Sequence, residues 1–207
     1  MSIASLGRFT VPVGMDPTSQ GILMPKLKFR FRIVFESFGS TSSQSTLVEL
    51  TKQVKSAKKP TVTFGDIVLD TYNSKVKLIG KPEWGDFTCA LRDDAHGNVS
   101  KLVGEQIQKQ FDFMQQSSAA AGVDYKFVTT LDILDGGNGA YEPAILETWK
   151  MYGCFIQAAD YGELDYDTND PQEIALTIKY DNALQTPLSS GVGADLGRKY
   201  GSTNSTS

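Results

Sequence analysis

The sequence has little of what most catalytic sites require. Its 207 residues contain one histidine, His96, and two cysteines, Cys89 and Cys154. A Ser-His-Asp or Cys-His arrangement could use only His96, which lies in the turn-like segment RDDAHGN. Both cysteines lie in apolar, strand-like runs, DFTCAL and MYGCFI, a setting that favours buried thiols over a disulfide.

Long apolar runs and an excess of positive charge are also missing. No run approaches the roughly 20 apolar residues that span a bilayer. The first residues, MSIASLGRFTVPVG, lack the charged region followed by an apolar one that marks a secretory signal. The formal net charge of -4 disfavours tight binding to nucleic acid or to an anionic membrane. We therefore predict a protein that is made and kept in the cytosol, without membrane insertion.

Large apolar residues are plentiful, and many of them alternate with polar ones. Hydrophobic residues make up 40% of the chain, with 11 Phe and 8 Tyr, which is enough for one core. Such alternation places apolar side chains on one strand face, beginning with Leu27, Phe29, Phe31, Ile33 and Phe35. Further strand-like runs follow, about seven or eight strands in all: LVELTKQV, TVTFGDIVLD, SKVKLIG, DFTCALRDD, Tyr125 to Leu134, Ala144 to Ile156 and EIALTIKY.

One helix interrupts the strands. Apolar residues recur there at intervals of four and three, on a single face: Val99, Val103, Ile107, Phe111 and Met114. Asn98 is available as the N-cap. We predict a helix over about residues 98–116 that packs on a sheet. The fold class is then mainly β, an antiparallel β-barrel or sandwich with one flanking α-helix.

The composition changes at both ends of the chain. Residues 1–24 hold scattered Gly and Pro without a sustained period, which predicts an extended N-terminal arm. Residues 186–207 are rich in Gly, Ser and Thr and carry too little apolar content to fold alone, which predicts a C-terminal tail. Residues 25–185 between them are predicted to form one β domain.

Glycine and acidic motifs predict turns rather than binding sites. The DGGNG cluster at 135–139 lacks the Gly-Lys-Ser/Thr ending of a phosphate-binding loop and is read as a hairpin turn. Asp165, Asp167 and Asn169 have the spacing of the first three ligands of a calcium loop. An aspartate stands where that loop needs its glycine, however, and Leu176 stands in place of the bidentate glutamate. A solvated turn is the favoured interpretation.

The sequence also holds two clusters of charged residues. Asp93 and Asp94 are adjacent in sequence, and nothing places a partner carboxylate opposite them across a cleft, so glycosidase chemistry has no support. Lysines gather in one segment to form a local basic patch: Lys52, Lys55, Lys58 and Lys59. We interpret it as a solvated loop. A specific anion site is less favoured, because no aromatic residues interleave with the lysines. We predict no catalytic residue, no metal and no cofactor.

Three segments of the chain carry a resemblance to a known family. The first is EWGDFTCALRDDAH (83–96), which leads into the helix. The second is TWKMYGCFIQAADYGELDYDTNDPQEIALTIKYDNAL (148–184), in which Gly-Glu-Leu-Asp and an Asp/Asn turn precede an alternating strand. The third is KLKFRFRI with the LTKQVKSAKKPTV segment after it. Over roughly residues 25–184 the chain resembles the tail tube family of contractile-tailed bacteriophages, although it lacks the proline that relatives often carry before Gly-Glu-Leu-Asp.

The resemblance implies a structural protein rather than an enzyme. Members have a β-barrel or sandwich fold with a flanking helix, and form hexameric rings that stack into a hollow tube inside a contractile sheath. The tube is the conduit for genome delivery, in the virion tail, and is assembled in the host bacterial cytoplasm. The implied partners are further copies of the chain, the tail sheath, the baseplate or tube initiator, the tail terminator, the tape measure protein, and double-stranded DNA that passes without specific binding.

The residues are compatible with this assembly. Sheet edges that pair between subunits satisfy backbone groups that an isolated domain leaves exposed. Residues 1–24, Ser37 to Lys59 and the tail from Thr186 are candidates for contacts between rings. Acidic residues repel DNA phosphates, so the segment from Asp160 to Asp170 is a candidate contributor to a lumen surface.

Two other functions stay open. A tube protein of a related contractile injection device, such as a tailocin or type VI secretion apparatus, would obey the same physics with a different cargo. A monomeric β-sandwich binding module, for carbohydrate among other ligands, would present exposed aromatics on a groove. An enzyme ranks last, because the histidine, metal and phosphate motifs that one would use are missing.

Overall fold

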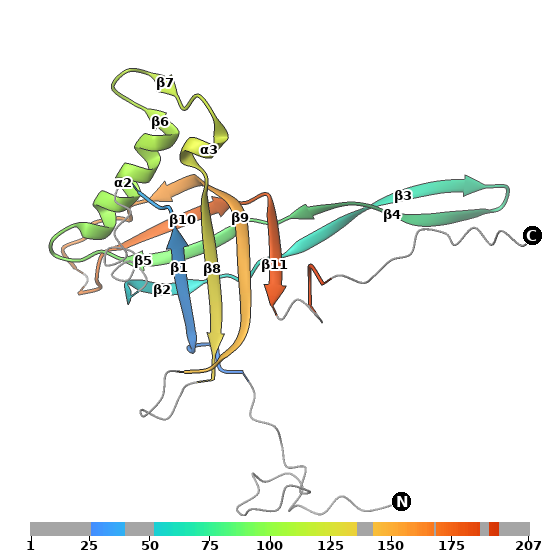
Figure 1. The fold of residues 1–207 in the computed structure, drawn as a ribbon, viewed down its shortest axis with the longest axis horizontal. Coiled ribbons are helices and arrows are strands. Elements are labelled where there is room, and N and C mark those ends of the chain that lie inside the picture. The colour runs from blue at the N-terminus through green and yellow to red at the C-terminus, as the bar shows by residue number, and fades with distance from the viewer. Residues whose placement is uncertain (1–25, 40–51, 136–142, 168, 187–190, 195–207) are drawn as a thin grey trace, which may run out of the picture.

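The computed structural model describes residues 26–39, 52–135, 143–167, 169–186 and 191–194. These residues form a mainly β, antiparallel protein with a flanking helix, which confirms the predicted fold class (Figure 1). The predicted arm at 1–24 and most of the predicted tail lie outside them. The strands are β1 (Phe31–Glu36), β2 (Val54–Ala57), β3 (Val62–Thr71), β4 (Ser74–Trp84), β5 (Phe87–Arg92), β6 (Phe111–Asp112), β7 (Ser117–Ser118), β8 (Phe127–Leu134), β9 (Ile145–Asp160), β10 (Glu173–Lys179) and β11 (Asn182–Thr186). The helices are α2 (Asn98–Gln110) and α3 (Gly122–Tyr125).

Most strands belong to one antiparallel sheet, in the order β1-β8-β9-β10-β5-β2, with β11 also paired to β9. The 16-residue strand β9 joins the two halves of this sheet, because its first part pairs with β8 and β11 and its last part with β10. Gly153 lies between these parts with φ 68°, a conformation that favours glycine. Figure 1 shows β1, β8 and the first part of β9 crossing β10, β5 and β2 at a steep angle, as in a sandwich.

The core lies between the two halves. β10 contributes Ile174, Leu176 and Ile178, the alternating face predicted for EIALTIKY, and all three side chains are buried. Opposite them, β1 and β8 contribute further buried side chains: Ile33, Phe35, Phe127 and Leu131. Phe38 closes one end of this core, with its ring centroid 5.1 Å from that of Phe35 and 4.9 Å from that of Phe127. Packed aromatic pairs of this kind add about 0.5–1.5 kcal/mol beyond their burial.

The flanking helix is shorter than predicted. Helix α2 starts at Asn98 as expected but ends at Gln110, not near residue 116. The two apolar residues that extended the predicted stripe lie beyond it: Phe111 is in β6, and Met114 is 94% exposed. The reason is local, because the carboxylate of Asp112 accepts hydrogen bonds from the backbone N–H groups of Met114 and Gln115, which stabilises a turn.

The start of the helix also differs from the prediction in detail. Asn98 is the first helical residue and not the N-cap, since Gly97 precedes it with φ 68°. Asp94 fulfils the capping role from further back, because its Oδ1 accepts a hydrogen bond of 2.7 Å from the backbone N–H of Asn98. The helix buries Val99, Leu102, Val103 and Gln106 against the core.

Several predicted strand boundaries are wrong, and those of β1 and β4 have a clear local cause. β1 begins at Phe31 and not at Leu27, because residues 27–30 form a turn in which the N–H of Arg30 donates to the carbonyl of Leu27. β4 runs to Trp84, through the turn predicted from Pro82, because Trp84 still pairs with Val62. The predicted DGGNG turn lies outside the described residues, apart from its first residue. No helix in the described ranges is both long and apolar enough to cross a membrane.

Candidate assembly surface

The structure assigns capping roles to the acidic residues near the single histidine. His96 is exposed in the turn before α2. Asp93 Oδ1 accepts hydrogen bonds from the backbone N–H groups of Asp94 and Ser100, and Asp94 caps Asn98. The hydrogen bond from the Asn98 backbone lowers the pKa of Asp94. The described residues contain no group of three His, Cys, Asp or Glu side chains that could hold a metal ion.

The acidic segment after β9 forms an exposed loop. Asp165 Oδ1 accepts a hydrogen bond of 3.0 Å from the backbone N–H of Asp167, and Asp160 Oδ1 accepts one of 3.0 Å from Gly162. These short-range bonds fold the loop on itself, in agreement with the predicted turn. Leu164 is largely exposed and Tyr166 is fully exposed. The structure thus places apolar and acidic side chains together on a solvent-facing loop.

The two cysteines are buried and unbridged, as predicted. Cys89 is on β5 and Cys154 is on β9, and neither forms a disulfide. Burial raises the pKa of the Cys89 thiol to about 12 and that of Cys154 to about 11. Thiols in this state are poor nucleophiles and poor metal ligands, because both kinds of chemistry use the thiolate.

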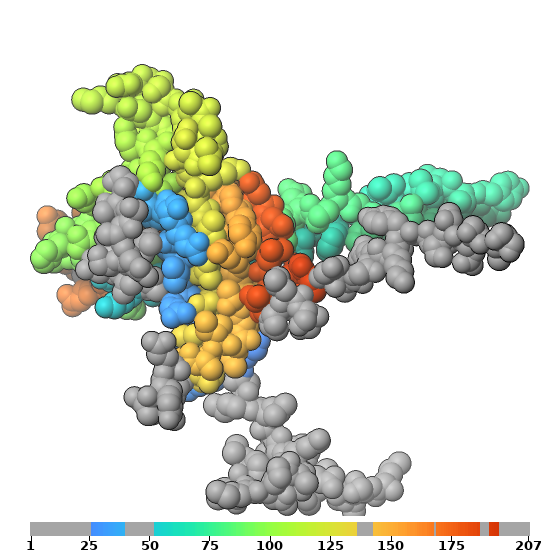
Figure 2. Space-filling view, viewed as in Figure 1, coloured from blue at the N-terminus to red at the C-terminus, as the bar shows by residue number. Residues whose placement is uncertain are grey.

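The most unusual feature of the molecule is the hairpin formed by β3 and β4. Among the described residues these strands pair only with each other, and they extend away from the sheet (Figures 1 and 2). The tip turns at Tyr72 and Asn73, within the turn predicted over Asp70 to Asn73. An isolated two-stranded hairpin is at best marginally stable in water. A hairpin of this length is therefore expected to pack against another surface when the protein functions.

The two faces of this hairpin differ in chemistry. Ile67 pairs with Leu78, and Leu69 pairs with Val76, so these four side chains share one face, which we call the apolar face. Each of them is between 45% and 50% exposed. The other face is mostly charged and carries Asp66, Val68, Asp70, Lys75, Lys77 and Ile79. An ordinary solvated ribbon would not keep four adjacent apolar side chains together in water.

The two strands at the ends of the main strand order, β1 and β2, are open edges of the sheet. Among the described residues β1 pairs only with β8, and β2 pairs only with β5, so the outer backbone groups of both strands lack ladder partners. A groove of about 460 Å³ lies between these strands, lined in part by Phe31, Ile33 and Val54. Open edges are the surfaces through which a sheet can pair with another chain.

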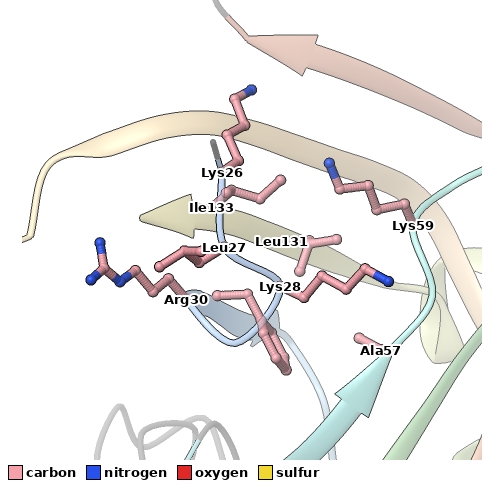
Figure 3. Close-up of a pocket in the computed structure, with 9 residues that line it drawn as sticks. Lys26, Leu27, Lys28, Arg30, Ala57, Lys59, Leu131 and Ile133 are labelled. Atoms are coloured by element: carbon pink, nitrogen blue, oxygen red, sulfur yellow. The ribbon is translucent and has the colours of Figure 1, made fainter. Parts of the chain in front are cut away.

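The predicted basic patch is divided by the fold. Lys55 pairs with Glu173 at 2.5 Å, which leaves it occupied within the molecule. Lys59 instead joins three cations from the turn before β1, and together they surround a pocket of about 320 Å³, which we call the cationic pocket. It is lined by Lys26, Leu27, Lys28, Arg30, Phe31, Ala57, Lys59, Leu131 and Ile133 (Figure 3). The sequence did not reveal this site, because its cations come from two segments about 30 residues apart.

One buried carboxylate supports the cationic pocket. Glu147 on β9 lies 2.5 Å from Lys26 Nζ and 3.6 Å from Lys59 Nζ, and it also accepts hydrogen bonds from Trp149 Nε1 and Gln185 Nε2. Burial alone would raise the pKa of Glu147, but the hydrogen bonds from Lys26 and Trp149, together with the charges of Lys59 and Lys26, outweigh it and lower that pKa. The carboxylate stays charged and holds the two lysines in place.

Comparison with known proteins gives likenesses of structure only. No protein-family model and no curated protein matches the chain. A sheath/tube terminator of the extracellular contractile injection system PVC, in its extended state, is similar with a TM-score of 0.57 and 14% identity, over 80% of this chain and 99% of that one. The tube-terminating cap of the anti-feeding prophage is similar with a TM-score of 0.55 and 13% identity, over 80% of this chain and 93% of that one. A chain of the PVC sheath-tube complex in its extended state has a TM-score of 0.54 and 15% identity, over 79% of this chain and 93% of that one. The chain therefore has the fold found in tube and terminator assemblies of contractile injection systems.

Proposed function

We propose that this chain is the tube subunit of a contractile bacteriophage tail, which assembles into hexameric rings that stack into the inner tube. The observation that carries the proposal is the apolar face of the β3–β4 hairpin, with Ile67, Leu69, Val76 and Leu78 uncovered in a single copy. Apolar surface of this kind gains about 25 cal/mol per Å² when it is covered. A second copy of the chain supplies the cover.

The fold and the sheet edges support the same conclusion. The similar structures come from tube, terminator and sheath-tube assemblies, none of which is named as an enzyme. The open edges of β1 and β2 offer backbone groups to a neighbouring subunit. Contacts of one surface with a different surface on the next copy close into rings or extend as filaments, depending on the rotation.

In this role the tube is the conduit for DNA. A net charge of -4 suits a channel that DNA must traverse without binding, because carboxylates repel phosphates. The remaining partners follow from the geometry of a tail, with sheath outside, an initiator at the baseplate, a terminator at the far end and a tape measure protein inside. The site of action is the virion tail, after assembly in the bacterial cytoplasm.

A second candidate is the terminator or tube subunit of a contractile injection device. The observation in its favour is that two of the similar structures are terminators. A terminating subunit forms a ring that stops growth, whereas a tube subunit forms rings that stack without limit. The two roles therefore differ in the length of the assembly.

Negative-stain electron microscopy of the purified chain at high concentration, with light scattering on the same sample, tests the proposal. We expect long hollow tubes. Single rings that never stack would favour the terminator, and a stable particle of 22.6 kDa under all conditions would overturn assembly altogether. Intact particles then separate the two devices, because DNA leaves through the tube of a phage and other cargo leaves through that of an injection device.

A further inference from the structure

The cationic pocket carries more positive charge than the described residues around it neutralise. Lys26, Lys28, Arg30 and Lys59 line it, and Glu147 is the one carboxylate that pairs with any of them among the described residues. The guanidinium of Arg30 donates to the backbone carbonyl of Asp135, which is a neutral acceptor. Lys28 is exposed and forms no ion pair with the described residues. A concave surface with this balance attracts anionic groups.

The floor of the cationic pocket is apolar. Figure 3 shows the side chains of Leu27, Leu131 and Ile133 between the surrounding cations. The volume of about 320 Å³ is at the lower end of the range of roughly 300–1,000 Å³ for ligand sites. The combination fits a ligand that presents one or two apolar side chains flanked by carboxylates.

The loop after β9 has this chemistry. Residues 160–167, DYGELDYD, which we call the acidic loop, contain four carboxylates, no cation and the apolar side chains of Tyr161, Leu164 and Tyr166. All eight residues are exposed, Leu164 at 81% and Tyr166 fully. The hydrogen bonds within the loop hold its backbone before any partner arrives, which reduces the entropy that docking would cost.

We propose that the acidic loop of one copy docks in the cationic pocket of a neighbouring copy, with Leu164 or Tyr166 on the apolar floor and the carboxylates against Lys28 and Lys59. This inference rests on the proposed tube function, since it names one of the contacts between subunits. Within a single copy the loop and the pocket share no ion pair among the described residues, so the complementary surfaces remain available to different copies. A contact between two different surfaces propagates from copy to copy.

A peptide experiment tests the contact without requiring tubes. A fluorescent DYGELDYD peptide is titrated with the full chain at a concentration at which the chain is dispersed. We expect saturable binding that Lys28→Glu weakens by about fivefold to tenfold, as expected for loss of a close charge pair. Lys101→Glu, on the exposed face of α2, is the matched control and should leave binding unchanged. A peptide with Ser in place of Leu164 and Tyr166 should bind more weakly than the original.

Assembly of charge-reversed chains gives the second arm. Lys28→Glu and Glu163→Lys should each reduce tube yield, and the double variant should recover it in part, because the charges are exchanged across the contact. Absence of peptide binding at about 1 mM, a limit of roughly -4 kcal/mol, would overturn the proposal. Normal tubes from Lys28→Glu would also overturn the proposal. That result is expected if the acidic loop faces the lumen, or if the chain's own N-terminal segment fills the cationic pocket.

The two arms also keep this proposal separate from the tube function. Tubes that form normally from every charge variant, with no peptide binding, would reject the loop contact and leave the tube subunit intact. Peptide binding that follows the predicted charge dependence, in a chain that forms no tubes, would keep the contact and reject the tube.

Discussion

The amide of Gln106, which is fully buried in helix α2, accepts a hydrogen bond of 2.9 Å at Oε1 from the backbone N–H of Gly39. Its Nε2 donates a hydrogen bond of 2.6 Å to the carbonyl of Tyr125, so one side chain ties α2 both to the segment after β1 and to helix α3. We expect Gln106→Leu to lower the free energy of unfolding by about 2–4 kcal/mol, because the buried N–H of Gly39 and the half-buried carbonyl of Tyr125 both lose their partner. Urea denaturation of the dispersed chain measures this.

The control for this substitution lies one half-turn away on the same helix. Gln108 is exposed, and its side chain bonds only to Asp112 among the described residues. Gln108→Leu should change the stability by less than about 0.5 kcal/mol. Equal losses from both leucine variants would mean that the buried amide contributes nothing specific.

The two faces of the β3–β4 hairpin give a prediction about assembly. Leu69 and Val68 are neighbours in β3, are 48% and 43% exposed, and point to opposite faces. We expect Leu69→Lys to abolish tubes, because it places a charge in the apolar face that a second copy covers. Val68→Lys adds the same charge to the face that already carries Asp70 and Lys77, and tubes should persist. Electron microscopy and pelleting compare the two variants.

Monomer stability must be unchanged for that comparison to hold. Both positions lie on a ribbon outside the core, so neither lysine should shift the unfolding transition by more than about 0.5 kcal/mol. If Val68→Lys disrupts tubes as strongly as Leu69→Lys, the two faces do not differ in role and the apolar face is not the contact.

The fold was predictable from the sequence where one strand face is buried. Ile174, Leu176 and Ile178 occupy alternate positions in the sequence and lie in the core. Alternate side chains of a strand point to the same face, so an alternating apolar pattern predicts which face is buried. The pattern could not tell where α2 ends, since Phe111 and Met114 continue the helical spacing while Asp112 stabilises a turn between them. Local hydrogen bonding overrode periodicity at that point.

The candidate site was less predictable, because it depends on which side chains the rest of the fold leaves exposed. The sequence of β3 and β4 reads as ordinary strands of a meander, and nothing in it says that Leu69 and Leu78 remain uncovered. Likewise Lys59 was visible as part of a basic patch, but its approach to Lys26 and Glu147 arises from strand order. Alternation separates two faces and does not say which of them meets solvent.

Gly153 should be intolerant of a side chain. Its φ is 68°, and a Cβ there would lie 2.1 Å from Oδ2 of Asp181, which pairs with Lys126 at 2.6 Å. We expect Gly153→Ala to cost about 1–3 kcal/mol through backbone strain and displacement of Asp181. Gly104→Ala in α2 is the control, since nothing lies within 4 Å, and it should stabilise by about 1 kcal/mol. A destabilised Gly104→Ala variant would contradict the open space beside this position.

Glu147 predicts how stability depends on pH. Its pKa is lowered in the folded chain from an ordinary value of 4.5, so the folded state binds this proton more weakly than the unfolded state. The stability that Glu147 contributes is therefore complete above pH 4.5 and is lost as the pH falls through the lowered value. Glu147→Gln should cost about 1–2 kcal/mol at pH 7 and flatten the acid limb of a stability-pH curve.

The matched control for the pH experiment is Glu36→Gln. Glu36 is exposed and lies 3.3 Å from Lys150, and exposed pairs of this kind contribute about 0–1 kcal/mol. Its curve should follow that of the unchanged chain. A Glu147→Gln curve that also runs parallel to the unchanged chain at all pH values would show that the Lys26 and Trp149 contacts do not control this carboxyl.

The buried thiols give a last prediction. The raised pKa values of Cys89 and Cys154, about 12 and 11, leave almost no thiolate at pH 8. Alkylation of the folded chain should therefore be at least about 100-fold slower than in denaturant, where the thiols titrate normally. Ser118→Cys, at an exposed position in β7, is the positive control and should react at once with one equivalent. Because the thiols lie on different strands of the core, their release to reagent reports global unfolding, and rapid labelling of the folded chain would contradict the packing described for β5 and β9.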